Sequence, residues 1–361
     1  MSVRPLTEYC TLNMGQSPDS KTYNTQGNGL PFYQGNADFG ETHPITRVWC
    51  SAPVKVAEEG DILISVRAPI GAMNMAVERC CIGRGLAALT PIRNKCSKQF
   101  LYYALQSKVD SLVAQGTGST FKAISKKVLE ATCIPAYSTI EQEQIAETIG
   151  HVDNTIAAKR KQLALLDQLV KSRFIELFGD PKQNPKGYPV KEFDEISVLI
   201  TDGEHATPRR TDKGIYLLSA RNILNHALQL DDVDYIDEEE YARIARRVVP
   251  QAGDVLISCS GSIGRCCVVP EEFRFQMVRS AALIRFDDTI KPVFAEWLIT
   301  SDELQRQISM SATQSSQANL FQGKIRKLRG YVPPMELQEQ FAAFVEQTDK
   351  SKLCGKMEVA A

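Results

Sequence analysis

One uninterrupted stretch of the chain, Glu141 to Phe178, constrains the possible folds more than any other. It contains no proline and a single glycine, Gly150. Its apolar residues recur at alternating steps of four and three, the spacing of a coiled-coil seam, and a helix of this length extends about 57 Å. The stretch predicts a spacer helix, although a long amphipathic core helix has the same pattern. The predicted seam residues are Ile145, Ile149, Val152, Ile156, Leu163, Leu166, Val170 and Leu177.

The segments on either side of this stretch repeat each other. GDILISVRAPIG, beginning at Gly60, matches GDVLISCSGSIG, beginning at Gly253, at an offset of 193 residues (253 − 60). The AAL at Ala87 likewise matches the AAL at Ala281, and the EQEQIA at Glu141 matches a later LQEQFA. Chance does not preserve the order of so many features, so we predict a tandem duplication of a globular domain followed by a helix.

The composition is that of an ordinary globular protein. With 361 residues, 43% of them hydrophobic, the chain is long enough for about two domains whose cores need no metal or disulfide. Its ten cysteines follow no metal-binding or secretory pattern, so we expect reduced, mostly buried thiols in a cytoplasmic protein. No apolar run reaches the length of a membrane span. The net charge of −1 leaves nucleic acid open as a partner, through local patches only.

Strands and short helices alternate in the expected secondary structure of both halves. Gly60–Val77 is typical of two strands joined by a turn, Arg84–Pro91 of a buried strand and Ser97–Gln115 of a helix. A Gly/Pro-rich segment then ends the long helix. We predict an α+β fold with globular domains at 1–136 and 181–334, a helical spacer at 137–180 and a shortened second helical region at 335–361.

These features, in this order, resemble the DNA-specificity subunits of type I restriction-modification systems over nearly the whole chain. The resemblance is carried by the two GD-I/V-LIS strand pairs, the two I/V-P…EQ-x-x-I/F-A helix starts and the LFGDP that ends the long helix. It implies two target-recognition domains, each reading one half of a bipartite, asymmetric site in double-stranded DNA. It also implies that the helices pair as an antiparallel coiled coil and set the distance between the half-sites.

The resemblance further implies that catalysis belongs to partner proteins. Modification (methyltransferase) subunits would dock on the helices with S-adenosylmethionine, and a restriction (translocase and nuclease) subunit would use ATP and Mg. The chain has no methyltransferase, P-loop or hydrolase motif, so we expect a non-catalytic subunit that binds no cofactor or metal itself. The same lack of motifs argues against a standalone methyltransferase.

Polar loops of the first half supply candidates for DNA contact. Amide side chains can pair with adenine edges, and basic side chains can bind phosphate or guanine. An ordinary surface turn is the alternative for each loop. The first-half candidates are Gln16, Ser17, Lys21, Tyr23, Gln34, Asn36, Arg67, Thr117, Ser119 and Lys122.

The second half offers a corresponding set. Arg209 and Arg210, beside a proline turn, can clamp phosphate, and the basic run from Lys324 to Arg329 resembles a phosphate-facing strand. A solvated charged face is the alternative for both. The second-half candidates are His205, Thr207, Arg209, Arg210, Arg221, Asn222, Ser260, Gln314, Ser315, Gln317, Asn319, Lys324 and Arg326.

The second helical region is shorter than the first. At the offset that matches the two EQ motifs, the equivalent of Phe178 falls at 374 (178 + 196), whereas the sequence stops at Ala361. Phe341 and Val345 keep the seam, but the tail from Cys354 onward is not helical by its pattern.

An antiparallel partner of that length covers only part of the long helix. We expect pairing around Leu163 to Leu177, which leaves the seam from Ile145 to Ile156 bare. An exposed apolar surface marks an interaction site, so we expect self-association through it or cover by modification subunits. The competing interpretation of the whole chain is a coiled-coil scaffold whose globular domains bind protein.

Overall fold

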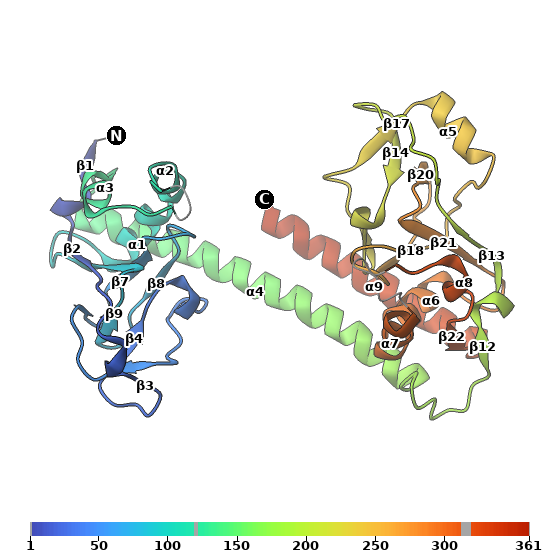
Figure 1. Ribbon diagram of the computed structural model, residues 1–361, viewed down its shortest axis with the longest axis horizontal. Coiled ribbons are helices and arrows are strands. Elements are labelled where there is room, and N and C mark those ends of the chain that lie inside the picture. Colours follow the sequence, from blue (N-terminus) through green and yellow to red (C-terminus); the bar gives the residue numbers. More distant parts are fainter. Residues whose placement is uncertain (1, 119–121, 312–318, 361) are drawn as a thin grey trace. The chain divides into compact units, whose positions relative to one another are not determined.

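A computed structural model describes residues 2–118, 122–311 and 319–360, with residues 354–360 described by their backbone alone. The chain divides into two compact units, residues 1–157 and 158–361, and each combines sheets with helices (Figure 1). The boundary between the units falls inside one continuous helix, α4 (Thr139–Phe178). The predicted α+β fold and the long helix are therefore confirmed.

The first unit is built from short strands followed by short helices. Its strands are β1 (Val3–Pro5), β2 (Cys10–Met14), β3 (Tyr23–Asn24), β4 (Leu30–Tyr33), β5 (Trp49–Cys50), β6 (Val56–Ala57), β7 (Ile62–Ser65), β8 (Met73–Met75), β9 (Cys80–Ile82), β10 (Leu86–Pro91) and β11 (Cys133–Pro135). The helices that precede α4 are α1 (Lys98–Gln106), α2 (Val109–Ala114) and α3 (Lys126–Ala131). One sheet has the order β2-β10-β7-β8 and another the order β3-β5-β4-β9-β6.

The second unit repeats this plan. Its strands are β12 (Val190–Glu192), β13 (Ser197–Asp202), β14 (Ile215–Leu218), β15 (Ile223–Leu224), β16 (Ala227–Leu228), β17 (Asp234–Ile236), β18 (Val255–Ser258), β19 (Cys266–Val268), β20 (Phe275–Met277), β21 (Ala281–Phe286) and β22 (Arg329–Tyr331). Its other helices are α5 (Glu238–Ala245), α6 (Pro292–Ile299), α7 (Asp302–Ser311), α8 (Gln322–Ile325) and α9 (Met335–Ala360). The sheet order β13-β21-β18-β19 matches β2-β10-β7-β8 strand for strand, which confirms the predicted duplication.

The central strands are buried on both faces, which explains their unbroken apolar sequences. In β7, Ile62 and Ile64 belong to the core cluster that contains residues of α1 and α2. Leu63, between them, belongs to the cluster that contains residues of β4 and β9. Alternate residues of β18 divide in the same way in the second unit. Each four-stranded sheet thus has a helical core on one face and a second sheet on the other.

The register of the strands corrects one sequence match by a single residue. Leu86 pairs with Ser65 in the first unit, and Ala281 pairs with Ser258 in the second. Because the two serines occupy the same place in the repeated GDxLIS motif, Ala281 is equivalent to Leu86 and not, as predicted, to Ala87. The identical letters AAL are out of register because the segment between the serine and the last strand is two residues longer in the second unit.

Each long helix begins with the same buried anchor. The Gln142 carboxamide accepts a hydrogen bond from the Ser97 N–H (2.9 Å) and donates to the carbonyls of Lys95 and Tyr137. Gln338 makes three equivalent bonds in the second unit. Both glutamines are fully buried. The repeated EQ motif therefore ties the first turn of each helix to the loop that precedes α1 or α6.

The start of α4 is also capped. Ser138 and Glu141 form a capping box, in which the Ser138 N–H and hydroxyl both donate to the Glu141 carboxylate at 2.7 Å. These bonds hold the pKa of the Glu141 carboxyl below its usual range. The sequence Ser-Thr-Ile-Glu thus sets the point at which the long helix begins.

Within the second unit, α9 packs antiparallel to the end of α4. Phe341 contacts the rings of Phe174 and Phe178, with centroid distances of 5.4 and 5.5 Å. Further along α9, the Lys352 ammonium pairs with the Asp167 carboxylate at 2.8 Å. Residue numbers therefore fall along α4 as they rise along α9. The antiparallel pairing is confirmed, over the part of α4 that the sequence predicted.

Two predicted helix boundaries are wrong. The helix expected at Ser97–Gln115 is interrupted between α1 and α2, where the Ser107 hydroxyl donates to the Ala104 carbonyl (2.8 Å). The tail beyond Cys354 is helical as far as Ala360, because lysine, methionine, glutamate and alanine form helices without an apolar seam.

The predicted bare seam is also shorter than expected. Ile145 packs against the core of the first unit, beside the buried Ala146. Ile149 and Ile156 are half-buried, and Val152 is 53% exposed. The first turns of α4 therefore pack on the globular domain that precedes them, and this contact covers the seam at Ile145.

Candidate nucleic-acid interface

A pocket of about 400 Å³ in the first unit gathers four of the predicted DNA contacts. Tyr23, Gln34, Asn36 and Arg67 line it, together with Arg84. β4 and β9 are parallel neighbours, with Tyr33 opposite Ile82, so the residues that follow them leave the sheet at the same edge. This topology brings side chains together that lie far apart in the sequence.

An aromatic pair forms one wall of this pocket. The Tyr23 and Phe32 rings stack with centroids 4.6 Å apart, and the Tyr23 hydroxyl donates to the Pro18 carbonyl. The Asp38 carboxylate accepts the Gln34 N–H (2.7 Å), which shapes the turn after β4. The Gln34 side chain is exposed, so its amide is available to a ligand.

The loop before α3 runs alongside Arg67. Ala123 forms backbone bridges with both Arg67 and Thr117, and the Ala68 N–H donates to the Lys122 carbonyl (3.1 Å). Thr117 and Lys122 are exposed there, whereas Ser119 lies outside the described residues. Gln16, Ser17 and Lys21 follow β2, and the Ser17 hydroxyl accepts the Arg84 N–H (3.3 Å).

Two arginines, Arg67 and Arg84, line the pocket together with the Asp38 carboxylate, and Lys122 lies in the adjoining loop. The side chains of Arg67, Arg84 and Lys122 are exposed, and none of them forms an ion pair with another described residue. Amides, stacked rings and free cations in one concavity suit contact with nucleotide bases and phosphates.

The second unit places its predicted arginines differently. Arg209 pairs with Asp237 and Glu239, both at 2.8 Å, and these hydrogen bonds raise the pKa of its guanidinium. Arg210 and Arg221 share Asp234, at 3.0 and 3.2 Å. Carboxylates therefore neutralise the cations that the sequence presented as phosphate clamps. DNA would have to displace these carboxylates to reach them.

Asn222 is wrong as a base contact, because its side chain is fully buried. Its amide donates to the carbonyls of Gln229 and Asp232, and its oxygen accepts the N–H and hydroxyl of Ser219. Every hydrogen-bonding position of the carboxamide is used within the fold. Asn222 holds the turn after β14 instead.

The basic run after residue 321 is not the predicted strand. Lys324 lies on the short helix α8 and is exposed, and only the end of the run, from Arg329, is in strand β22. Arg326 is half-buried, bonds to the Asp194 carboxylate and donates to the Ile200 carbonyl (3.0 Å). Arg326 therefore ties α8 to the sheet.

The remaining second-half candidates lie near strand ends. His205 pairs with Asp202 at 2.7 Å, Thr207 is exposed, and Ser260 forms a backbone bridge with Asn319. Gln314, Ser315 and Gln317 lie outside the described residues.

Sequence reasoning missed Arg84, although it lines the pocket. A signal was present, because an arginine also precedes the corresponding strand of the second half, at Arg279. The misaligned AAL match placed these two arginines out of register.

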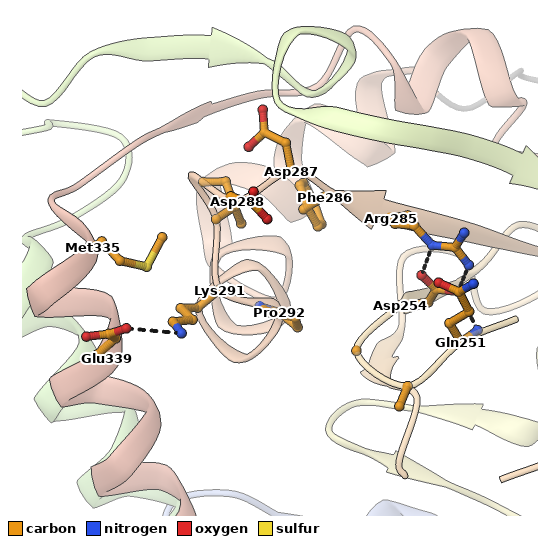
Figure 2. Close-up of a pocket in the computed structure, with 13 residues that line it drawn as sticks. Gln251, Asp254, Arg285, Phe286, Asp287, Asp288, Lys291, Pro292, Met335 and Glu339 are labelled. Atoms are coloured by element: carbon orange, nitrogen blue, oxygen red, sulfur yellow. Dashed lines mark hydrogen bonds and ion pairs between the residues drawn. The ribbon is translucent and has the colours of Figure 1, made fainter. Parts of the chain in front are cut away.

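The second unit also contains a cleft of about 510 Å³, at the start of α9 (Figure 2). Arg285 holds the buried Asp254 with two hydrogen bonds of 2.7 and 2.8 Å, and Lys291 pairs with Glu339 at 3.1 Å. None of the predicted DNA contacts that the structure describes lines this cleft. The Lys291–Glu339 pair joins α9 to the start of α6, and the Arg285–Asp254 pair joins β21 to the residue before β18.

The cysteines are placed as predicted. Among those that the structure describes, seven are buried, and the adjacent Cys80 and Cys81 belong to different core clusters. Burial raises the pKa of the Cys80 thiol to about 12, so it stays protonated. Within the described residues, no cluster of His, Cys, Asp or Glu is arranged to hold a metal, and no helix is long and apolar enough to cross a membrane.

The fold defines a protein with two repeated α+β domains joined by a long helix. Residues 1–168 match the family model of the type I restriction modification DNA specificity domain. The putative MjaX specificity subunit of Methanocaldococcus jannaschii is 41% identical over 164 residues, 45% of this chain and 39% of the relative. The MjaIX specificity subunit of the same organism is 24% identical over 75% of this chain and 68% of its own length.

A solved structure supports the fold over the full chain. The type I restriction-modification S subunit of M. genitalium matches with a TM-score of 0.62 at 15% identity, over 99% of this chain and 92% of its own. On these matches the chain is similar to type I restriction-modification specificity subunits, in sequence over residues 1–168 and in fold over its length. It spans about two fifths of the length of the MjaX relative.

Proposed function

We propose that this chain is the DNA sequence-specificity subunit of a type I restriction-modification complex. Each globular domain reads one half of a bipartite, asymmetric site in double-stranded DNA. The observation that carries the proposal is the duplicated domain on a continuous helix of 40 residues, with a pocket of amides and free cations at the strand ends of the first unit. The names of the relatives support the same role.

Catalysis in this proposal belongs to partner subunits. Modification subunits bring S-adenosylmethionine, a restriction subunit brings ATP and Mg, and the chain contributes recognition without chemistry of its own. Exposed aliphatic residues on α4 support docking there: Val152, Leu165 and Leu169 are 53%, 55% and 49% exposed. Self-association through α4 is the alternative use of this surface, and light scattering that shows a strict monomer at micromolar concentration would exclude it.

Salt dependence separates DNA reading from a protein-binding scaffold. For a protein that binds DNA, the logarithm of the binding constant falls linearly with the logarithm of the salt concentration, because binding releases counterions from the phosphates. We expect such a slope in fluorescence anisotropy with a duplex that carries the site. Flat affinity between about 50 and 200 mM salt would favour the scaffold. Methylome sequencing of a host with and without the gene identifies the site to be used.

Shortening α4 is expected to shorten the spacer between the half-sites. Deleting the heptad Thr155–Lys161 removes about 10 Å of helix while nearly preserving the helical face. It leaves intact the segment from Asp167 to Phe178, which pairs with α9. The preferred spacer should shrink by about three base pairs at ~3.4 Å each, with both half-sites unchanged.

Selection from a duplex library with randomised spacers measures this shift. The substitution Thr155→Ala keeps the helix length and serves as the control. A changed half-site sequence, or an unchanged spacer, would contradict the role of α4 as a ruler.

A further inference from the structure

Arg84 and Arg279 occupy the same position in the two units. Arg84 lies two residues before Leu86, which pairs with Ser65. Arg279 lies two residues before Ala281, which pairs with Ser258, the equivalent serine of the second unit. Each also lies two residues after a strand, β9 or β20, that pairs in parallel with β4 or β14. The equivalence thus follows from strand register.

The backbone around both arginines is held by the same contacts. Gly15 N–H donates to the Leu86 carbonyl (2.9 Å), and Gly203 N–H donates to the Ala281 carbonyl (3.0 Å). A side chain at either glycine would begin within 2.4 Å of a carbonyl oxygen, so the close approach requires glycine. The loop after β2 or β13 is therefore pressed against the segment that carries the arginine.

That loop also binds each arginine directly. The Arg84 N–H donates to the Ser17 hydroxyl (3.3 Å), and the Arg279 N–H donates to the Glu204 carbonyl (3.0 Å). Both side chains are exposed and form no ion pair with a described residue. This differs from Arg209, Arg210 and Arg221, which carboxylates neutralise. Hydrogen bonds thus hold the backbone of Arg84 and of Arg279, while both guanidinium groups remain exposed to solvent.

The neighbouring positions differ between the units. Arg67 is equivalent to Ser260, and Gln16 and Ser17 are equivalent to Glu204 and His205 by the same register. Two readers of different half-sites need different groups for the bases, but they meet the same phosphate backbone. A residue that both units share is therefore suited to contact phosphate, and residues that differ are suited to read bases.

We propose that Arg84 and Arg279 are a matched pair of phosphate-binding residues that position the two domains on DNA, while Arg67 and its counterpart Ser260 read sequence. This assignment rests on the proposed DNA-reading function. If the assignment holds, Arg84 and Arg279 strengthen binding to every DNA sequence by the same factor. They then contribute nothing to the choice between one DNA sequence and another.

The test compares Arg84→Gln, Arg279→Gln and Arg67→Ser in the full-length chain. Anisotropy is measured across a salt series with the site-bearing duplex and a scrambled duplex. Each Arg→Gln change should weaken binding to both duplexes by a similar factor and reduce the log–log salt slope by about 0.9, the contribution of one phosphate. Arg67→Ser should instead reduce the ratio between the two duplexes.

Arg4→Gln and Arg306→Gln are matched controls, because Glu8 and Glu303 pair with these arginines. Their slopes should stay close to that of the unmodified chain. Unchanged affinity in Arg84→Gln or Arg279→Gln, or a loss confined to the site-bearing duplex, would overturn the assignment. Failure of the unmodified chain to bind any duplex with a salt slope would instead overturn the proposed function itself.

Discussion

The substitution Phe341→Ala is expected to destabilise the second unit by about 4 kcal/mol, because removing a buried phenyl ring leaves a cavity. The ring is fully buried among Phe174, Phe178 and Trp297. It joins α9 to α4 near the buried ends of both helices. Urea unfolding, followed by circular dichroism, measures the effect as a lower midpoint.

Leu353→Ala is the matched control, since this side chain lies on the same helix and is 60% exposed. It should change the free energy of unfolding by less than about 0.5 kcal/mol. If the two variants unfold alike, the packing of α9 on α4 does not stabilise the unit, and the antiparallel pair loses its energetic basis.

The substitution Gln338→Leu is expected to cost about 3 kcal/mol, although it nearly preserves the side-chain volume. It leaves the Lys291 N–H and the carbonyls of Thr289 and Pro333 without their buried partner. These groups now bond to Gln338 at 2.8 to 2.9 Å. The same urea experiment measures the loss.

Gln340→Leu is the control, because this glutamine is exposed in the same helical turn. It should be close to neutral. The equivalent pair in the first unit, Gln142→Leu against exposed Gln144→Leu, should behave the same way if the anchor is duplicated. A near-neutral Gln338→Leu would mean that the repeated EQ motif does not hold the helix in place.

The predicted elements were correct where the pattern is local. The strands at Ile62–Ser65 and Val255–Ser258 follow from short apolar runs bounded by Gly-Asp and Gly, and α4 follows from its period. The break between α1 and α2 was missed because the apolar spacing continues through it, and at the break the Ser107 hydroxyl donates to the Ala104 carbonyl.

The candidate site was predicted less well than the fold. Tyr23, Gln34, Asn36 and Arg67, chosen from the sequence as DNA contacts, lie in one pocket with Arg84, where the parallel pairing of β4 with β9 places them, and their contact with DNA stays a prediction. In the second unit the prediction was wrong at Asn222, because a polar side chain in a loop has the same sequence signature whether the fold buries it or leaves it exposed.

By itself, the sequence determined that this chain has two copies of one domain, a long helix between them and a second helix that starts with the same motif. Those properties depend on period, motif order and spacing, which are local. Only the tertiary structure decided which polar groups remain available to a ligand. Arg209 pairs with Asp237, 28 residues away, and the buried Asn222 bonds to Gln229 and Asp232, whereas Arg84 forms no ion pair with any residue that the structure describes. The physical reason is that ion pairs and burial depend on which segments the sheets place side by side.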